Sequence, residues 1–208
     1  MTDRHAFSVS TAPLEEQCEG LIARITVAAV AGVDWIQIRE KDLDGARLAE
    51  LARAVLAQVS PKCRILINDR LDVAYAVGAA GVHLGERSIS VQDAKLFTRQ
   101  KSISQPFSIG VSVHSLEAAQ RAESDGADYV IFGPIFATPS KVAFGEPQGL
   151  ERLGRICSAL KIPVMAIGGI TVETAPQCYA RGAAGIAGIR IFQEQPKLES
   201  LVTQLRRF

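Results

Sequence analysis

The sequence lacks the features that mark several common classes of protein. Its four cysteines show neither CxxC nor zinc-ligand spacing, which predicts free thiols in a reducing compartment. No apolar run approaches the roughly 18 residues of a membrane-spanning helix, and no signal peptide opens the sequence. The net charge is only +1, without a basic tail or a basic stripe interleaved with aromatic residues. We therefore expect a cytoplasmic protein whose partners include neither a membrane nor nucleic acid.

Linkers, low-complexity segments and charge blocks are also missing, so nothing in the composition divides the 208 residues into separate domains. With 48% hydrophobic and 22% charged residues, the chain can bury a full core. We expect one globular domain over residues 1–208. The composition is compatible with a homo-oligomer as well as with a monomer.

What the sequence does contain is a series of short apolar runs, each ending in a polar or glycine cluster. Helical patterns separate the runs. Several of these helices end at a glycine just before the next run, where a positive φ suits the turn. Apolar strands that alternate with helices predict a parallel sheet covered on both faces. The runs occupy residues 36–41, 65–69, 81–85, 109–114, 129–134, 164–169 and 185–190, and the glycines are Gly32, Gly78, Gly126 and Gly182.

Polar residues at the C-terminal ends of so many strands favour an α/β fold of the (β/α)8 TIM-barrel type, with its catalytic face at those ends. This arrangement predicts an enzyme. The first strand of such a barrel would precede residue 11, where only residues 6–10 or 2–4 are available, so we expect it to be short or truncated. Helices are expected at about residues 11–31, 44–58, 71–77, 90–99, 115–126, 149–160, 171–181 and 196–208.

Three polar residues, Gln37, Arg39 and Lys41, alternate along the first run. Residues two apart on a strand share a face, so their amide, guanidinium and ammonium groups are expected to point the same way. A solvated edge strand would show the same pattern. The flanking glycine junction and the barrel context favour an internal position, where the three groups suit a multiply charged oxyanion such as pyrophosphate.

Asn68 and Asp69 end the second run and precede a helix. One interpretation is a helix N-cap, although a cap needs only one of the two residues. The other interpretation is a metal site, because Mg²⁺ favours one or two carboxylates together with substrate phosphate oxygens. We predict that Asp69 is a Mg²⁺ ligand and that Asp72 is a weaker candidate.

A long loop after residue 134 carries Thr138, Ser140 and Lys141 among prolines and glycines. Its composition is typical of a loop that closes over a substrate. Hydroxyl groups flanking a lysine suit a phosphate clamp, and a solvated lysine is the alternative.

Glycine-rich segments end the last two strands: Gly168 and Gly169 after one, and residues 188–190, with Ile189 and Arg190, after the other. In this fold, the corresponding loops often bind phosphate through backbone N–H groups. The sequence therefore predicts a second phosphate site.

Two histidines lie on or just after strands. Ser112 and His114 are two residues apart and so are expected on one face. His114 either caps the helix that begins at Ser115 or transfers protons in a pocket. His83 lies within an apolar strand, where a hydrogen-bonded core histidine is favoured over a catalytic one.

These motifs, taken together, resemble a known family. The runs IQIREKD, ILINDRLDVAYAVGAAGVHLGE, IGVSVHSLEAAQRAESDGADYVIFGPIFATPSK, QGLERL and IPVMAIGGIT are similar to thiamine phosphate synthase and to its relative, the thiazole tautomerase. The likeness covers about residues 31–192 in order. It implies a (β/α)8 barrel in which the diphosphate of a hydroxymethylpyrimidine leaves with Mg²⁺ assistance, after which a thiazole phosphate nitrogen captures the pyrimidinyl-methylene cation.

The resemblance also implies roles for individual residues. Asp69 would bind Mg²⁺, Ser112 would contact the pyrimidine, and Gly168 with residues 188–190 would bind the thiazole phosphate. Thr138 and Ser140 would line the thiazole side. The pyrimidine diphosphate would be held by Gln37, Arg39, Lys41, Asn68 and Lys141.

Two departures from the family pattern keep alternatives open. Ser88 stands where the synthases have a second metal-binding aspartate, and Arg190 stands where they usually have serine. Glu86 is a candidate substitute for the missing aspartate. A tautomerase, which needs no Mg²⁺ and uses a histidine at the position of His114, is the second hypothesis. The third is a non-catalytic barrel that binds thiamine precursors or a partner protein. The retained anion-binding set favours the synthase.

Overall fold

The computed structural model describes residues 14–101, 106–137, 146–193 and 197–207. The contacts within the chain form two compact units. Met1–Val82 and Ile189–Gln204 make up the first unit, and His83–Gly188 and Leu205–Phe208 make up the second. The prediction of a single domain stays a prediction, and the expected first strand before residue 11 lies outside the described residues.

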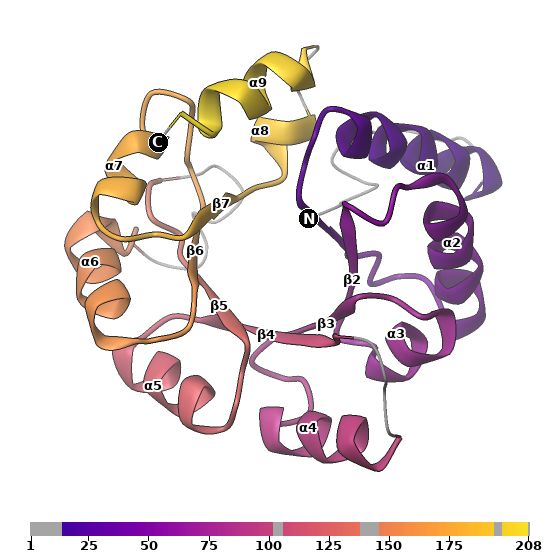
Figure 1. Cartoon of the computed structure of the whole chain (residues 1–208), viewed down its shortest axis with the longest axis horizontal. Coiled ribbons are helices and arrows are strands. Elements are labelled where there is room, and N and C mark those ends of the chain that lie inside the picture. Colours follow the sequence, from indigo (N-terminus) through magenta and orange to yellow (C-terminus); the bar gives the residue numbers. More distant parts are fainter. Residues whose placement is uncertain (1–13, 102–105, 138–145, 194–196, 208) are drawn as a thin grey trace. The chain divides into compact units, whose positions relative to one another are not determined.

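In the first unit, helices cover one side of a parallel strand pair (Figure 1). Strand β1 (Trp35–Ile38) pairs with β2 (Arg64–Asn68), with Ile36 opposite Ile65. Helix α2 (Gly45–Gln58) begins after Asp44, whose side chain accepts a hydrogen bond from the Arg47 amide. The unit also contains α1 (Leu14–Val30), α3 (Leu71–Val77), α8 (Arg190–Gln193) and most of α9 (Leu198–Leu205).

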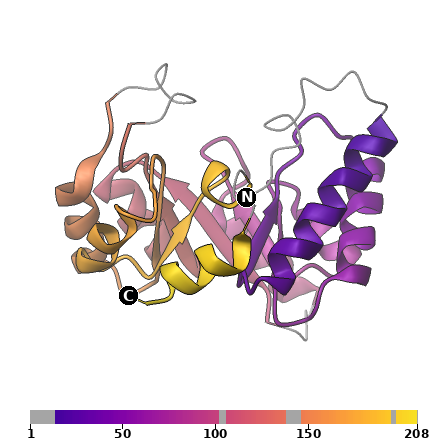
Figure 2. The same cartoon turned by 90° about the horizontal axis from the view of Figure 1, so that it is seen from above.

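The second unit repeats the strand–helix pattern, and Figures 1 and 2 show its helices outside its strands. Strands β4 (Ser108–Val113), β5 (Tyr129–Phe132), β6 (Val164–Ile167) and β7 (Gly185–Ala187) pair in parallel, each with the next. Strand β3 (Gly81–Leu84) crosses from the first unit into the second. The other elements are α4 (Val91–Gln100), α5 (Leu116–Ser124), α6 (Gly149–Ala159) and α7 (Ala175–Ala180).

The strands follow one another in chain order from β1 to β7, and helices alternate with them. This is the order of a parallel α/β barrel, so the predicted fold class is confirmed. All four junction glycines have positive φ: 92° at Gly32, 69° at Gly78, 94° at Gly126 and 91° at Gly182. A residue with a Cβ would be strained at each of these positions, which explains why the same junction recurs in the sequence.

Some helix boundaries differ from the prediction. Helix α7 begins at Ala175 rather than at Thr171, because the Thr171 amide donates to the Thr174 hydroxyl at 2.8 Å and forms a turn instead. The sequence pattern did not predict the short helix α8. In the part of the chain that the structure describes, no helix is both long and apolar enough to span a membrane.

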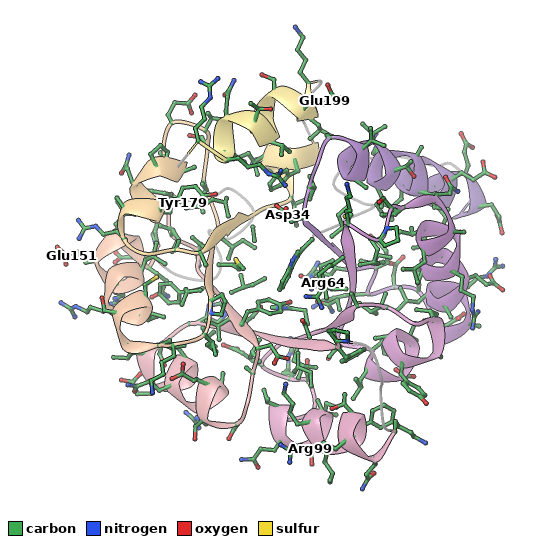
Figure 3. All side chains as sticks on the ribbon, viewed as in Figure 1. Asp34, Arg64, Arg99, Glu151, Tyr179 and Glu199 are labelled. Atoms are coloured by element: carbon green, nitrogen blue, oxygen red, sulfur yellow. The ribbon has the colours of Figure 1, made fainter. Side chains whose placement is uncertain are left out.

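The N-terminal ends of β1 and β2 carry a polar group of their own. The Arg64 guanidinium lies 5.3 Å from the centre of the Trp35 ring and donates to the Ala80 carbonyl at 3.3 Å. Figure 3 shows Arg64 on the side of β2 away from α2. By contrast, Glu151 on α6 points outward from its helix in the same view. A group at this end of the strands is expected to stabilise the fold rather than to act on substrate.

Candidate active site

In the first unit, two amide side chains meet at the C-terminal ends of neighbouring strands. Gln37 of β1 is 5% exposed, and its Nε2 donates to Oδ1 of Asn68, the last residue of β2, at 2.8 Å. The bond occupies the Asn68 oxygen, so with respect to the described residues the Asn68 NH₂ group keeps its donors for another acceptor. The pair therefore presents a fixed donor of the kind that a phosphate oxygen accepts.

The two cations of the predicted set lie next to this pair in the sequence but not on the strand. Strand β1 ends at Ile38, so Arg39 and Lys41 follow it and the expected strand alternation is wrong for both. Arg39 is half-buried and Lys41 is exposed. Glu40 is 4% exposed, and the sequence reasoning missed it because a glutamate in a polar cluster gives no signal of burial.

Asp69 has an unusual backbone conformation directly after β2. Its φ is 66°, the one positive value among the described residues other than glycine, and aspartate is among the residue types that tolerate this region. Neither Asp69 nor Asn68 caps a helix, because α3 has Arg70 at its N-cap and no side-chain cap bond. The N-cap interpretation is therefore wrong, and the exposed Asp69 carboxylate is not used to start the helix.

Asp72, the weaker metal candidate, is held by a neighbouring cation. The Arg70 guanidinium donates to both Asp72 oxygens, at 2.9 and 2.6 Å. These hydrogen bonds lower the pKa of Asp72. Among the described residues, no three acidic, histidine or cysteine side chains are grouped to hold a metal. Because Mg²⁺ needs only one or two carboxylates when it also binds substrate phosphates, Asp69 fits an ion that binds together with a diphosphate.

In the second unit, His114 follows β4 and is oriented by a backbone carbonyl. Its Nδ1 lies 2.7 Å from the Gly133 oxygen, so Nδ1 carries the hydrogen that is donated. Its Nε2 lies 3.6 Å from Oε1 of Glu86, and both side chains are exposed. Ser115 caps α5 by accepting a hydrogen bond from the Ala118 amide, so the alternative in which His114 caps this helix is wrong.

Ser112 is part of a buried network that includes His83. The His83 Nε2 lies 2.8 Å from the Ser112 hydroxyl oxygen, and His83 Nδ1 lies 3.0 Å from the Tyr129 hydroxyl oxygen. His83 is 3% exposed, and burial lowers its pKa to about 4. The hydrogen-bonded core histidine is therefore confirmed. Its link to Ser112 was missed, because nothing in the sequence pairs residues 29 positions apart.

His83 should make stability depend on pH. Its pKa lies near 6.5 in the unfolded chain and near 4 in the folded one, so the unfolded state binds more protons between these values. We expect the free energy of unfolding to fall by about 3 kcal/mol from this group as the pH drops from 6.5 to 4. Urea unfolding of the native chain and of His83→Gln across this range measures the contribution. Equal pH slopes for the two proteins would contradict it.

Gly168 and Gly169 follow β6 with φ of 99° and 63°. A Cβ at Gly168 would lie 2.5 Å from the Pro134 Cβ, and one at Gly169 would lie 2.5 Å from the Ala137 carbonyl oxygen. The Phe136 amide also donates to the Gly168 carbonyl at 3.0 Å. Only glycine lets the backbone after β6 pack this closely against the loop after β5.

The remaining predicted residues fall into three groups. Ser88 accepts from the Gly85 amide at 2.7 Å, so its hydroxyl closes a turn rather than replacing a carboxylate. Ile189 is half-buried, and the exposed Arg190 opens α8 in the first unit. Thr138, Ser140 and Lys141 lie outside the described residues.

Comparisons with known proteins identify the family. A family model described as thiamine monophosphate synthase matches residues 10–192. A putative thiamine-phosphate synthase of Geobacter sulfurreducens is 42% identical over 178 residues, or 85% of this chain and 81% of that protein. The thiamine-phosphate synthase of Methanoculleus marisnigri is 43% identical over 164 residues, or 78% of this chain and 75% of that protein.

A solved structure agrees with these sequence matches. The thiamine phosphate pyrophosphorylase of Pyrococcus furiosus is 31% identical, with a TM-score of 0.80 over 99% of this chain and 91% of that one. The strand-end motifs quoted above predicted the same relationship. This chain therefore belongs to the thiamine monophosphate synthase family.

Proposed function

We propose that this chain is a transferase that couples hydroxymethylpyrimidine diphosphate to thiazole phosphate, with release of pyrophosphate. The observation that carries the proposal is the bonded Gln37–Asn68 pair at the ends of β1 and β2, followed directly by Arg39, Lys41 and Asp69. Amide donors, two cations and a carboxylate match a diphosphate that leaves together with a divalent cation.

The chain's own residues prepare the departure of the diphosphate. The bond between the pyrimidine methylene carbon and the diphosphate oxygen breaks, and its electron pair leaves with the oxygen. Arg39 and Lys41 balance the charge that develops there, and the Asn68 NH₂ group donates to a phosphate oxygen. Mg²⁺ held by Asp69 would offset further negative charge on the leaving group. The thiazole nitrogen then forms the new carbon–nitrogen bond.

Other residues position the two rings. The family resemblance implies that Ser112 contacts the pyrimidine, that Gly168 and Gly169 bind the thiazole phosphate through backbone groups, and that Ile189 and Arg190 also bind this phosphate. The family resemblance adds Thr138 and Ser140 on the thiazole side and Lys141 on the diphosphate. The enzyme acts in the cytoplasm on these small molecules alone, and a homo-oligomer is compatible with this role.

The direct test is to incubate the purified chain with both phosphorylated rings and Mg²⁺ and to measure thiamine phosphate and pyrophosphate. We expect both products in equal amounts, and none after chelation of Mg²⁺ with EDTA. Restored turnover on adding Mg²⁺ back controls for damage by the chelator. No product from folded protein would overturn the proposal. Equal rates with and without Mg²⁺ would overturn the role of Asp69.

The geometry of His114 supports a second candidate function, isomerisation of a thiazole carboxylate phosphate. The Gly133 carbonyl fixes the hydrogen on Nδ1, which leaves Nε2 of the neutral ring, 3.6 Å from Glu86, able to accept a proton. If the chain has this activity, we expect His114→Asn to lose it by about a hundredfold or more, the usual contribution of a general acid or base. The variant Glu86→Gln tests whether the neighbouring carboxylate contributes to this activity. A fully active His114→Asn variant would reject the proton-transfer role.

A further inference from the structure

We propose that Tyr129 and His83 form a one-way hydrogen-bond relay that makes Ser112 a hydrogen-bond donor to the bound pyrimidine. Both are positioning residues, since they act through Ser112 and not on the substrate. The inference rests on the proposed function for the contact between Ser112 and the pyrimidine. The direction of the relay follows from the contacts among His83, Tyr129 and Ser112, which all belong to the second unit.

The three side chains come from three successive strands. His83 on β3 bridges Tyr129 on β5 and Ser112 on β4, with distances of 3.0 and 2.8 Å. Tyr129 is 1% and His83 is 3% exposed, while Ser112 is half-buried. The relay therefore runs from the core to a hydroxyl group near the C-terminal end of β4, the end at which this fold places its catalytic residues.

The position of the Tyr129 ring is fixed by the absence of a side chain at Gly110. Gly110 is the register partner of Tyr129, and a Cβ there would lie 1.9 Å from a ring carbon. The ring thus lies directly over the backbone of β4, and its hydroxyl is kept within reach of His83. A glycine in the middle of a strand usually weakens the strand. The close approach of the Tyr129 ring explains why glycine is required at position 110.

The direction of the relay follows from the chemistry of its members. The buried His83 is neutral at pH 7, so one ring nitrogen donates and the other accepts. The phenol of Tyr129 is a more acidic donor than the alcohol of Ser112, so Tyr129 donates to Nδ1 and Nε2–H donates to Ser112. Donors aligned in one direction strengthen each other. The Ser112 hydrogen is then left for an external acceptor, and the ring nitrogens of a pyrimidine are such acceptors.

A double-mutant cycle tests the link to the substrate. We expect Tyr129→Phe to lower kcat/KM for the pyrimidine diphosphate about tenfold when Ser112 is present, and less than about twofold in a Ser112→Ala background. Tyr129→Phe should not change KM for thiazole phosphate in either background. Tyr75→Phe, at an exposed position on α3, is the matched control and should behave as the native chain. An equal loss in both backgrounds would show a merely structural role and overturn the proposal.

The tautomer of His83 supplies an independent readout that needs no variant and no turnover. In ¹⁵N–¹H NMR spectra of the native chain at pH 7, we expect His83 to carry its hydrogen on Nε2. A hydrogen on Nδ1 would reverse the relay and overturn the proposal. If the native chain fails to couple the rings while His83 shows the Nε2–H form, the proposed function fails and the direction of the relay stands. If the native chain couples the rings while His83 shows the Nδ1–H form, the proposed function stands and the direction of the relay is wrong.

Discussion

Asp69→Asn is expected to lower the rate of ring coupling by roughly a thousandfold, which corresponds to about 4 kcal/mol of lost transition-state stabilisation. The variant removes one negative charge and hardly changes the size of the side chain. Asparagine also tolerates the φ of 66° at this position, so the backbone should stay in place. The loss of coupling rate would thus measure the contribution of the negative charge that holds Mg²⁺. Thiazole phosphate binding should remain nearly intact, because Asp69 has no role in that site.

Two further variants separate the charge from other effects. Asp69→Ala should also abolish coupling, and it should destabilise the fold by about 1 kcal/mol more than Asp69→Asn, because alanine is strained at positive φ. Asp72→Asn is the matched control. Because Asp72 is paired with Arg70, this variant should lower the rate of ring coupling less than about threefold. Coupling rates and calorimetric titration with thiazole phosphate check these results. Full activity of Asp69→Asn would remove Asp69 as a metal ligand.

Gly168→Ala is expected to reduce the free energy of unfolding by about 3 kcal/mol or more, from steric overlap and backbone strain together. The new Cβ would lie 2.5 Å from the Cβ and 2.6 Å from the Cα of Pro134, and the φ of 99° disfavours any side chain. Relief would require the loop after β6 to move away from the loop after β5, breaking the Phe136–Gly168 hydrogen bond. Thiazole phosphate binding should weaken for the same reason.

Gly149→Ala in the same unit is the control for backbone strain alone. Its φ is 76°, but among the described residues no atom outside its chain neighbours and its own helix backbone lies within 4 Å of the added Cβ. We therefore expect a loss of only about 1 kcal/mol for this variant. Urea unfolding of the two variants and the native chain gives both values. Equal losses would mean that the contact with Pro134 has no energetic effect.

Local patterns in the sequence were enough to predict the elements of this fold. The apolar runs became parallel strands, and the helix at Leu71–Val77 has the predicted bounds. The junction glycines have the predicted backbone conformation. Such features depend on residues a few positions apart, because strand and helix periodicity, capping and positive φ are short-range effects. The motifs at the strand ends were equally local, and they identified the family.

The hydrogen-bond partners of the site residues could not be predicted from local patterns. Asn68 looked like a helix cap, yet its side chain bonds to Gln37, 31 residues earlier. Arg39 and Lys41 were placed on a strand that ends before them.

Short-range patterns along the chain are therefore enough to predict its strands, its turns and its family. The tertiary structure decided which side chains touch, as for His83, which bonds to Ser112 and Tyr129 on two other strands. These contacts arise because strand register and packing bring together residues that no local pattern connects.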